Sequence, residues 1–122
     1  MILVDTSVWI DHLRQGVPTL GALLEASRVV THPLIIGELA CGNLKNRSEL
    51  LRLWQSLPQL PEASHQEVLF FIEKNQLMGK GIGYIDIQLL ASIALSGGTR
   101  IWTRDKRLDA VAQQMDRAWK PD

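Results

Sequence analysis

The sequence predicts a three-layer α/β/α domain built around a central parallel sheet. Short runs of apolar, often β-branched residues alternate along the chain with longer segments whose apolar residues recur at helical spacing. Such alternation is typical of a parallel sheet that helices cover on both faces. Two of the short runs also lead into an aspartate, Asp5 and Asp105, and sites in folds of this class form beyond the carboxyl ends of the strands.

The N-terminus predicts a β-α unit. Residues 2–4 are an apolar run that ends in Asp5, so we expect a buried strand. Thr6 and Ser7 are candidate helix caps before a helix over residues 8–14.

The next segments continue the alternation of helix and strand. Residues 20–26 have helical spacing, and residues 28–31 form a β-branched run that predicts a second strand. Pro33 suits the first turn of a helix that runs to about residue 42, and residues 48–56 form a further amphipathic helix.

The middle of the chain holds the least regular stretch. Residues 57–61 contain two prolines, so they can form only a short edge strand. Ser64 and Glu67 have the spacing of a capping box, which predicts a helix through about residue 77. Three glycines then indicate a loop over residues 78–83.

The C-terminal part predicts a buried helix, a strand and a capped helix. Residues 84–95 are apolar almost all round, as in a buried helix, and a pair of glycines ends them. Residues 100–103 predict a strand, after which Asp105 caps a helix to about residue 115. Residues 117–119 are a candidate last edge strand.

Composition predicts one ordinary globular domain spanning residues 1–122. Apolar residues make up 46% of the chain and charged residues 21%, which excludes a wholly disordered protein. The single cysteine, Cys41, cannot form an internal disulfide, which favours a reducing compartment. Because neither a signal peptide nor an apolar run of about 18 residues is present, we expect a cytoplasmic protein without a membrane span.

The overall charge does not announce nucleic-acid binding, because thirteen basic residues balance thirteen acidic ones. Basic residues do gather beside Asp105, where Arg104, Lys106 and Arg107 are candidate contacts for RNA phosphates. The alternative is a solvated helix surface.

Glu38 and Asp86 stand out because they lie on apolar helix faces, where an unpaired charge is costly to bury. Glu38 shares its predicted face with Leu34, Ile35 and Cys41. Asp86 lies in the most hydrophobic predicted helix. We therefore expect both carboxylates to face inward and to need a cation.

Together with Asp5 and Asp105, these acids predict a metal site. Any one acid alone has the alternative of an arginine partner or a helix cap. Few basic residues lie on the predicted inner faces, and oxygen ligands without a histidine or cysteine cluster favour Mg²⁺ or Mn²⁺ over zinc. Carboxylate-held metals suit phosphodiester hydrolysis, and Thr6 and Thr103 are candidate supporting residues.

The residues in this order resemble a PIN domain, and more particularly a VapC-like toxin ribonuclease of a toxin–antitoxin pair. The resemblance rests on four motifs spread over essentially the whole chain: Val4-Asp5-Thr6-Ser7-Val8-Trp9, Gly37-Glu38-Leu39, Asp86 at the start of a long apolar helix, and Thr103-Arg104-Asp105. Leu108 stands where the family often places an aromatic.

This resemblance implies a metal-dependent endoribonuclease. It implies Asp5, Glu38, Asp86 and Asp105 as metal-binding catalytic acids, Mg²⁺ or Mn²⁺ as the cofactor, and RNA as the substrate. It also implies a homodimer and a cognate antitoxin protein that blocks the site.

Two further acids have other interpretations. Asp11 stands three residues before Arg14, which predicts a surface ion pair. Asp109 is one turn after Asp105 and is a possible outer-shell acid of the metal site.

Two alternative functions remain open at this point. A catalytically silent PIN-like binding module would be free to lose its acids, yet all four are present. A Mg²⁺-binding receiver-like signalling domain would be expected to carry paired acids after its first strand, where Asp5 stands alone.

Overall fold

The computed structural model describes residues 1–122 and contains the predicted parallel sheet. Its strands are β1 (Ile2–Val4), β2 (Val29–Val30) and β3 (Arg100–Trp102), in the order β2-β1-β3. Leu3 of the central strand pairs with Val30 on one side and Ile101 on the other. All three residues of β1 are buried, as expected for a strand covered on both faces.

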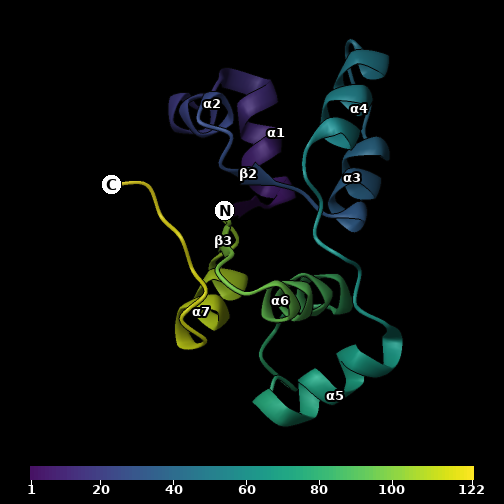
Figure 1. The fold of residues 1–122 in the computed structure, drawn as a ribbon, viewed down its shortest axis with the longest axis vertical. Helices are drawn as coiled ribbons and strands as arrows, with labels where there is room; N and C mark the ends of the chain where they lie inside the picture. Colours follow the sequence, from purple (N-terminus) through teal and green to yellow (C-terminus); the bar gives the residue numbers. More distant parts are fainter.

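Seven helices surround the sheet: α1 (Thr6–Gln15), α2 (Pro18–Glu25), α3 (Pro33–Ala40), α4 (Arg47–Ser56), α5 (His65–Asn75), α6 (Tyr84–Ser96) and α7 (Lys106–Gln114). In the view of Figure 1, α1 to α4 occupy the upper half of the molecule and α5 to α7 the lower half, with the strands between them. This arrangement confirms the predicted layers. None of these helices is both long enough and apolar enough to cross a lipid bilayer.

The two predicted edge strands are reduced to single bridges. Gln59 pairs with Thr31 beyond the end of β2, and Ala118 pairs with Ile101 of β3. Prolines flank the first of these segments, and proline cannot donate a hydrogen bond to a strand ladder. The backbone pairing therefore stops after one residue.

The helix caps are confirmed at two positions and corrected at a third. Ser64 and Glu67 form the predicted capping box of α5, and the Asp105 side chain caps α7. Thr6 and Ser7 were expected to be caps of α1, but the helix already begins at Thr6 and Asp5 is its N-cap. The hydroxyls of Thr6 and Ser7 are thus free for other contacts.

The buried helix α6 positions Asp86, and the ends of two neighbouring strands position Asp5 and Thr103. Leu89, Leu90 and Ile93 are fully buried, so α6 runs through the core as its composition predicts. Since β1 and β3 are parallel neighbours, the residues after each strand emerge at the same edge. Asp5 and Thr103 occupy these two positions.

Candidate metal site

Asp5 is the best-held acid of the candidate site. Its side chain is buried, and its Oδ2 accepts hydrogen bonds from Thr103 Oγ1 at 2.7 Å and from Ser7 Oγ at 2.9 Å. The two hydroxyls fix the carboxylate and leave Oδ1 available for a ligand. The predicted supporting residue Thr103 therefore does contact an acid.

Ser7 and Thr103 also connect the two strand ends. Ser7 Oγ accepts a hydrogen bond from the Arg104 backbone N–H at 3.1 Å, and Thr103 Oγ1 accepts one from the Asp105 N–H at 3.1 Å. Each hydroxyl thus donates to Asp5 and accepts from the chain after β3. The sequence places Ser7 beside the acids with a helix cap as the alternative, and these contacts favour the position beside the acids.

Glu38 lies at the site, but its predicted surroundings were wrong. The buried face of α3 consists of Ile35 and Leu39, whereas Glu38 and Cys41 are exposed. Glu38 turns toward α1 instead, where its Oε1 accepts a hydrogen bond from Thr6 Oγ1 at 2.9 Å. The expected supporting residue Thr6 therefore orients a second acid.

Asp86 is partly buried at the start of α6, and the charges of the other acids shift its pKa. Burial, as the largest cause, together with the charges of Asp5, Asp105 and Glu38, raises the pKa of Asp86 from 3.8 to about 6. A hydrogen bond from the Gly83 backbone opposes the rise. The carboxylates that are far apart in sequence are thus close enough to repel one another.

Asp105 caps a helix and also lies near Asp86. Its Oδ1 accepts hydrogen bonds from the backbone N–H groups of Arg107 and Leu108 at 2.9 and 3.1 Å, which caps α7. The residue itself is exposed and close enough to contribute to the raised pKa of Asp86. Oδ2 takes no part in the cap.

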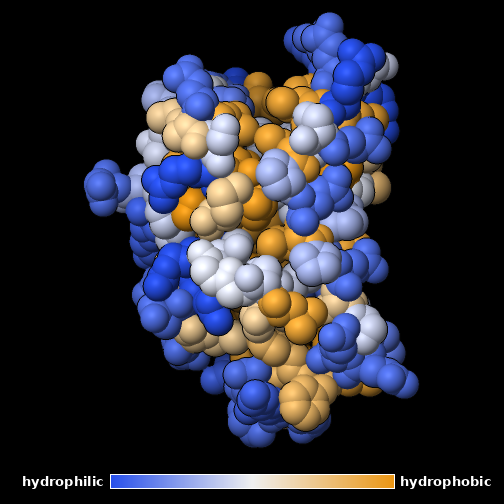
Figure 2. All heavy atoms as spheres, viewed as in Figure 1, coloured by the Kyte–Doolittle hydropathy of each residue, from blue (hydrophilic) through white to orange (hydrophobic).

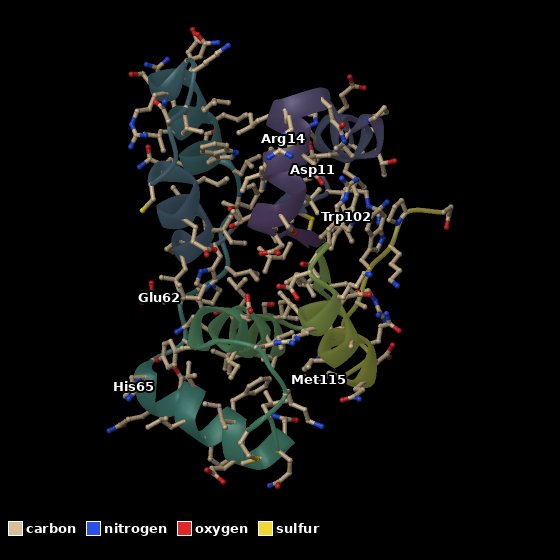
Figure 3. All side chains as sticks on the ribbon, turned by 180° about the vertical axis from the view of Figure 1, so that it is seen from behind. Asp11, Arg14, Glu62, His65, Trp102 and Met115 are labelled. Atoms are coloured by element: carbon tan, nitrogen blue, oxygen red, sulfur yellow. The ribbon has the colours of Figure 1, made fainter.

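Arg104, one of the basic residues beside Asp105, is already paired with an acid. Arg104 forms an ion pair with Asp11, so the predicted pairing of Asp11 with Arg14 was wrong. In Figure 3, Asp11 lies on the side of α1 that faces Trp102, and the Arg104 guanidinium is 5.9 Å from the centre of the Trp102 ring. The pairing brings together residues from opposite ends of the chain.

Asp109 forms an ion pair with a lysine and does not join the other acids. Its Oδ2 is 3.0 Å from Lys120 Nζ and accepts a hydrogen bond from Gln113. It is absent from the carboxylates that raise the pKa of Asp86. Beside it, Arg104, Lys106 and Asp105 help to line a shallow hollow of about 370 Å³.

Arg107 lies apart from Arg104 and Lys106, against the glycine-rich loop before α6. Its side chain packs over the loop before α6, where a Cβ on Gly81 would come within 2.9 Å of it. Gly81 also has a φ of 79°, a left-handed conformation that glycine adopts readily. The guanidinium therefore covers the loop that leads to Asp86.

The donor set fits a hard divalent cation that keeps part of its water shell. None of Asp5, Glu38, Asp86 or Asp105 takes part in any of the three ion pairs of the molecule. No group of three or more acidic, histidine or cysteine side chains lies close enough together to hold a metal ion directly. Mg²⁺ usually binds through one or two carboxylates and retains several waters, so an open arrangement of acids suits it.

Comparison with known proteins identifies the family of the chain. Residues 2–114 match the model of the PIN domain. The chain is 49% identical over 114 residues to Ribonuclease VapC32 from two strains of Mycobacterium tuberculosis, CDC 1551 / Oshkosh and ATCC 25618 / H37Rv, covering 93% of this chain and 92% of each relative.

A solved structure shares the fold. The crystal structure of PAE2754 from Pyrobaculum aerophilum superposes with a TM-score of 0.65 at 19% identity, covering 97% of this chain and 87% of that one. These matches exclude the receiver-like alternative. The chain belongs to the PIN-domain family.

Proposed function

We propose that this PIN-domain protein is an endoribonuclease that hydrolyses RNA phosphodiesters with Mg²⁺ or Mn²⁺ at Asp5, Glu38, Asp86 and Asp105. The ribonuclease activity follows from the family and from the 49% identity to a protein named as a ribonuclease over nearly its whole length. The observation that supports the site is the raised pKa of Asp86, caused by burial and by the other three carboxylates.

The residues of the chain have distinct roles in this proposal. Asp5 presents one carboxylate oxygen while Ser7 and Thr103 hold the other. Thr6 fixes the direction of Glu38, and the α7 cap fixes Asp105. When bound, the cation supplies an activated water and stabilises the charge that develops on the phosphate and the leaving oxygen.

The basic residues after β3 are proposed contacts for the RNA backbone. Arg104 and Lys106 are exposed beside Asp105, and Arg107 lies over the Gly81 loop. Contacts to phosphates position a strand without reading its sequence. Arg104 would have to exchange its ion pair with Asp11 for a phosphate, which costs little because a partly exposed pair contributes about 0–1 kcal/mol.

We further propose that the protein is a cytoplasmic toxin, forms a homodimer, and is blocked by a cognate antitoxin protein. Large apolar side chains remain exposed, among them Ile10 and Leu13 on α1 and Phe70 on α5. Figure 2 shows hydrophobic surface between polar regions on the face of the molecule that it presents. Exposed apolar surface of this kind favours protein partners.

A cleavage assay tests the proposal. We expect the purified chain to cut RNA, to lose this activity in EDTA, and to regain it with Mn²⁺ or Mg²⁺. Asp5→Asn should remain folded and lose more than the roughly 10- to 100-fold that removal of an outer-shell partner costs a metal site. Asp116→Asn is the matched control, because Asp116 is 92% exposed and pairs only with Arg100. Full activity of a folded Asp5→Asn protein would refute the site.

A further inference from the structure

A chain of buried hydrogen bonds joins the start of α3 to the middle of α6. His32 Nε2 lies 2.9 Å from Ser92 Oγ, and Ser92 Oγ lies 3.2 Å from Gln88 Oε1. Gln88 in turn holds the backbone of Ala63, accepting from its N–H at 2.7 Å and donating to its carbonyl at 2.9 Å. His32 and Ser92 are completely buried and Gln88 is 3% exposed.

The donor and the acceptor of each hydrogen bond in this network can be assigned. His32 Nδ1 accepts a hydrogen bond from the Leu34 N–H at 3.0 Å, so it cannot carry a proton. The neutral ring therefore has its proton on Nε2 and donates it to Ser92, which leaves the Ser92 hydroxyl to donate to Gln88. Burial lowers the pKa of His32 from 6.5 to about 4, which keeps the ring in this neutral form.

The chain links two helices that otherwise pack on different neighbours. Helix α3 packs on α1 and α4, whereas α6 packs on α5 and β3. Glu38 lies on α3 and Asp86 lies on α6. An eight-residue helix is only about 12 Å long, so holding its N-cap residue His32 also restrains the position of Glu38.

A helix cap alone does not account for the arrangement. The cap uses only Nδ1, and serine or asparagine would supply the same acceptor. Histidine adds a second ring nitrogen, Nε2, which lies on the far side of the ring and reaches Ser92. The added reach places a fixed donor between the two acid-bearing helices.

We propose that His32, Ser92 and Gln88 are positioning residues that set the separation of Glu38 from Asp86 and so the affinity of the site for a divalent cation. The inference rests on the proposed function, because it requires these acids to share a cation. A network that only stabilised the core would affect unfolding and leave cation binding by the folded protein unchanged.

Calorimetric titration with Mn²⁺, well below the melting temperature of each variant, tests the proposal. Ser92→Ala removes the link, and His32→Asn keeps the cap of α3 but does not reach α6. Each should weaken Mn²⁺ binding about tenfold, the lower end of what the loss of a supporting hydrogen bond costs a metal site. The double variant should also lose about tenfold rather than a hundredfold, because both changes break the same connection.

A matched control separates affinity from stability. Val17→Ala removes buried methyl groups at the N-cap of α2, a helix that carries none of the four acids, so it should lower the melting temperature and leave Mn²⁺ affinity unchanged. If the wild type binds Mn²⁺ and the two network variants bind it equally well, or if Val17→Ala weakens binding as much as they do, the positioning role is refuted. A wild type that binds no Mn²⁺ refutes the proposed function itself, and this inference with it.

Discussion

Replacing Asp86 by asparagine should stabilise the metal-free protein at neutral pH. Asp86 is partly buried, and burial together with the charges of Asp5, Asp105 and Glu38 makes its ionised form unfavourable. Asparagine keeps the size of the side chain and can still accept the hydrogen bond from Gly83. The variant therefore loses a repulsion without leaving a cavity.

The size of the effect follows from the pKa of Asp86. A rise from 3.8 to about 6 corresponds to about 3 kcal/mol at full strength, since one pKa unit is about 1.4 kcal/mol. Asp86 is partly exposed, and solvent screening reduces this to about 1–2 kcal/mol. For a chain of this length that raises the melting temperature by about 4–8 °C.

The pH dependence gives a second signature. Because the pKa of Asp86 is higher in the folded state than in the unfolded chain, the unfolded chain releases its proton first as pH rises. Wild-type stability should therefore fall relative to Asp86→Asn between about pH 4 and pH 6, and the difference should level off above pH 6. Below pH 4 the two proteins should be equally stable.

Thermal and urea unfolding in EDTA, from pH 4 to pH 8, measures this difference. Protonation of His32 also lowers the stability of the protein on acidification over a similar pH range, because burial lowers the pKa of His32 to about 4. His32 is present in both proteins, so its contribution cancels in the difference between them. Asp116→Asn controls for the charge change on an exposed side chain. Equal stability of Asp86→Asn and wild type at pH 8, or a difference that grows toward pH 4, would show that the acids do not repel one another as described.

Three further predictions concern neighbouring residues and the cation. Thr103→Val should cost about 1–2 kcal/mol in urea unfolding and reduce RNA cleavage, because Asp5 loses a donor and the Asp105 N–H an acceptor; unchanged cleavage would count against its role. Arg104→Ala should weaken RNA binding and flatten its salt dependence in a fluorescence titration while leaving Mn²⁺ affinity intact, and an unchanged salt slope would remove Arg104 from the interface. Mn²⁺ at 100 times its dissociation constant should stabilise the wild type by about 2.7 kcal/mol in thermal melts; Asp5→Asn should show almost none of this gain, and an equal gain would contradict the site.

Much of the fold could be predicted from the sequence because its signals are local. The apolar run of β1, the capping box of α5 and the Asp105 cap depend on residues within a few positions of each other, and all three are present. The edge strands could not be predicted reliably, because one bridge at Gln59 depends on how the chain returns to Thr31. Such long-range pairing leaves no periodic pattern.

The positions of the candidate acids in the fold were predictable, and their surroundings were less so; their role as cation ligands stays a prediction. Asp5 follows a strand and Asp86 opens an apolar helix, which are positions visible in the sequence. Glu38 was placed on a buried face because helical spacing alone does not say which side of α3 meets the core. The ion pair between Asp11 and Arg104 joins residues from opposite ends of the chain, so no local spacing could reveal it.

The most direct test is to locate Mn²⁺ on the folded protein by paramagnetic broadening of backbone amide signals in NMR spectra. We expect substoichiometric Mn²⁺ to broaden selectively the amides of Asp5, Glu38, Asp86 and Asp105 in the wild type, and Asp5→Asn to abolish the effect. The spectrum also reports on folding, so an unfolded variant would be recognised at once. Broadening centred elsewhere in the wild type, or no selective broadening at all, would contradict a cation site at these four carboxylates.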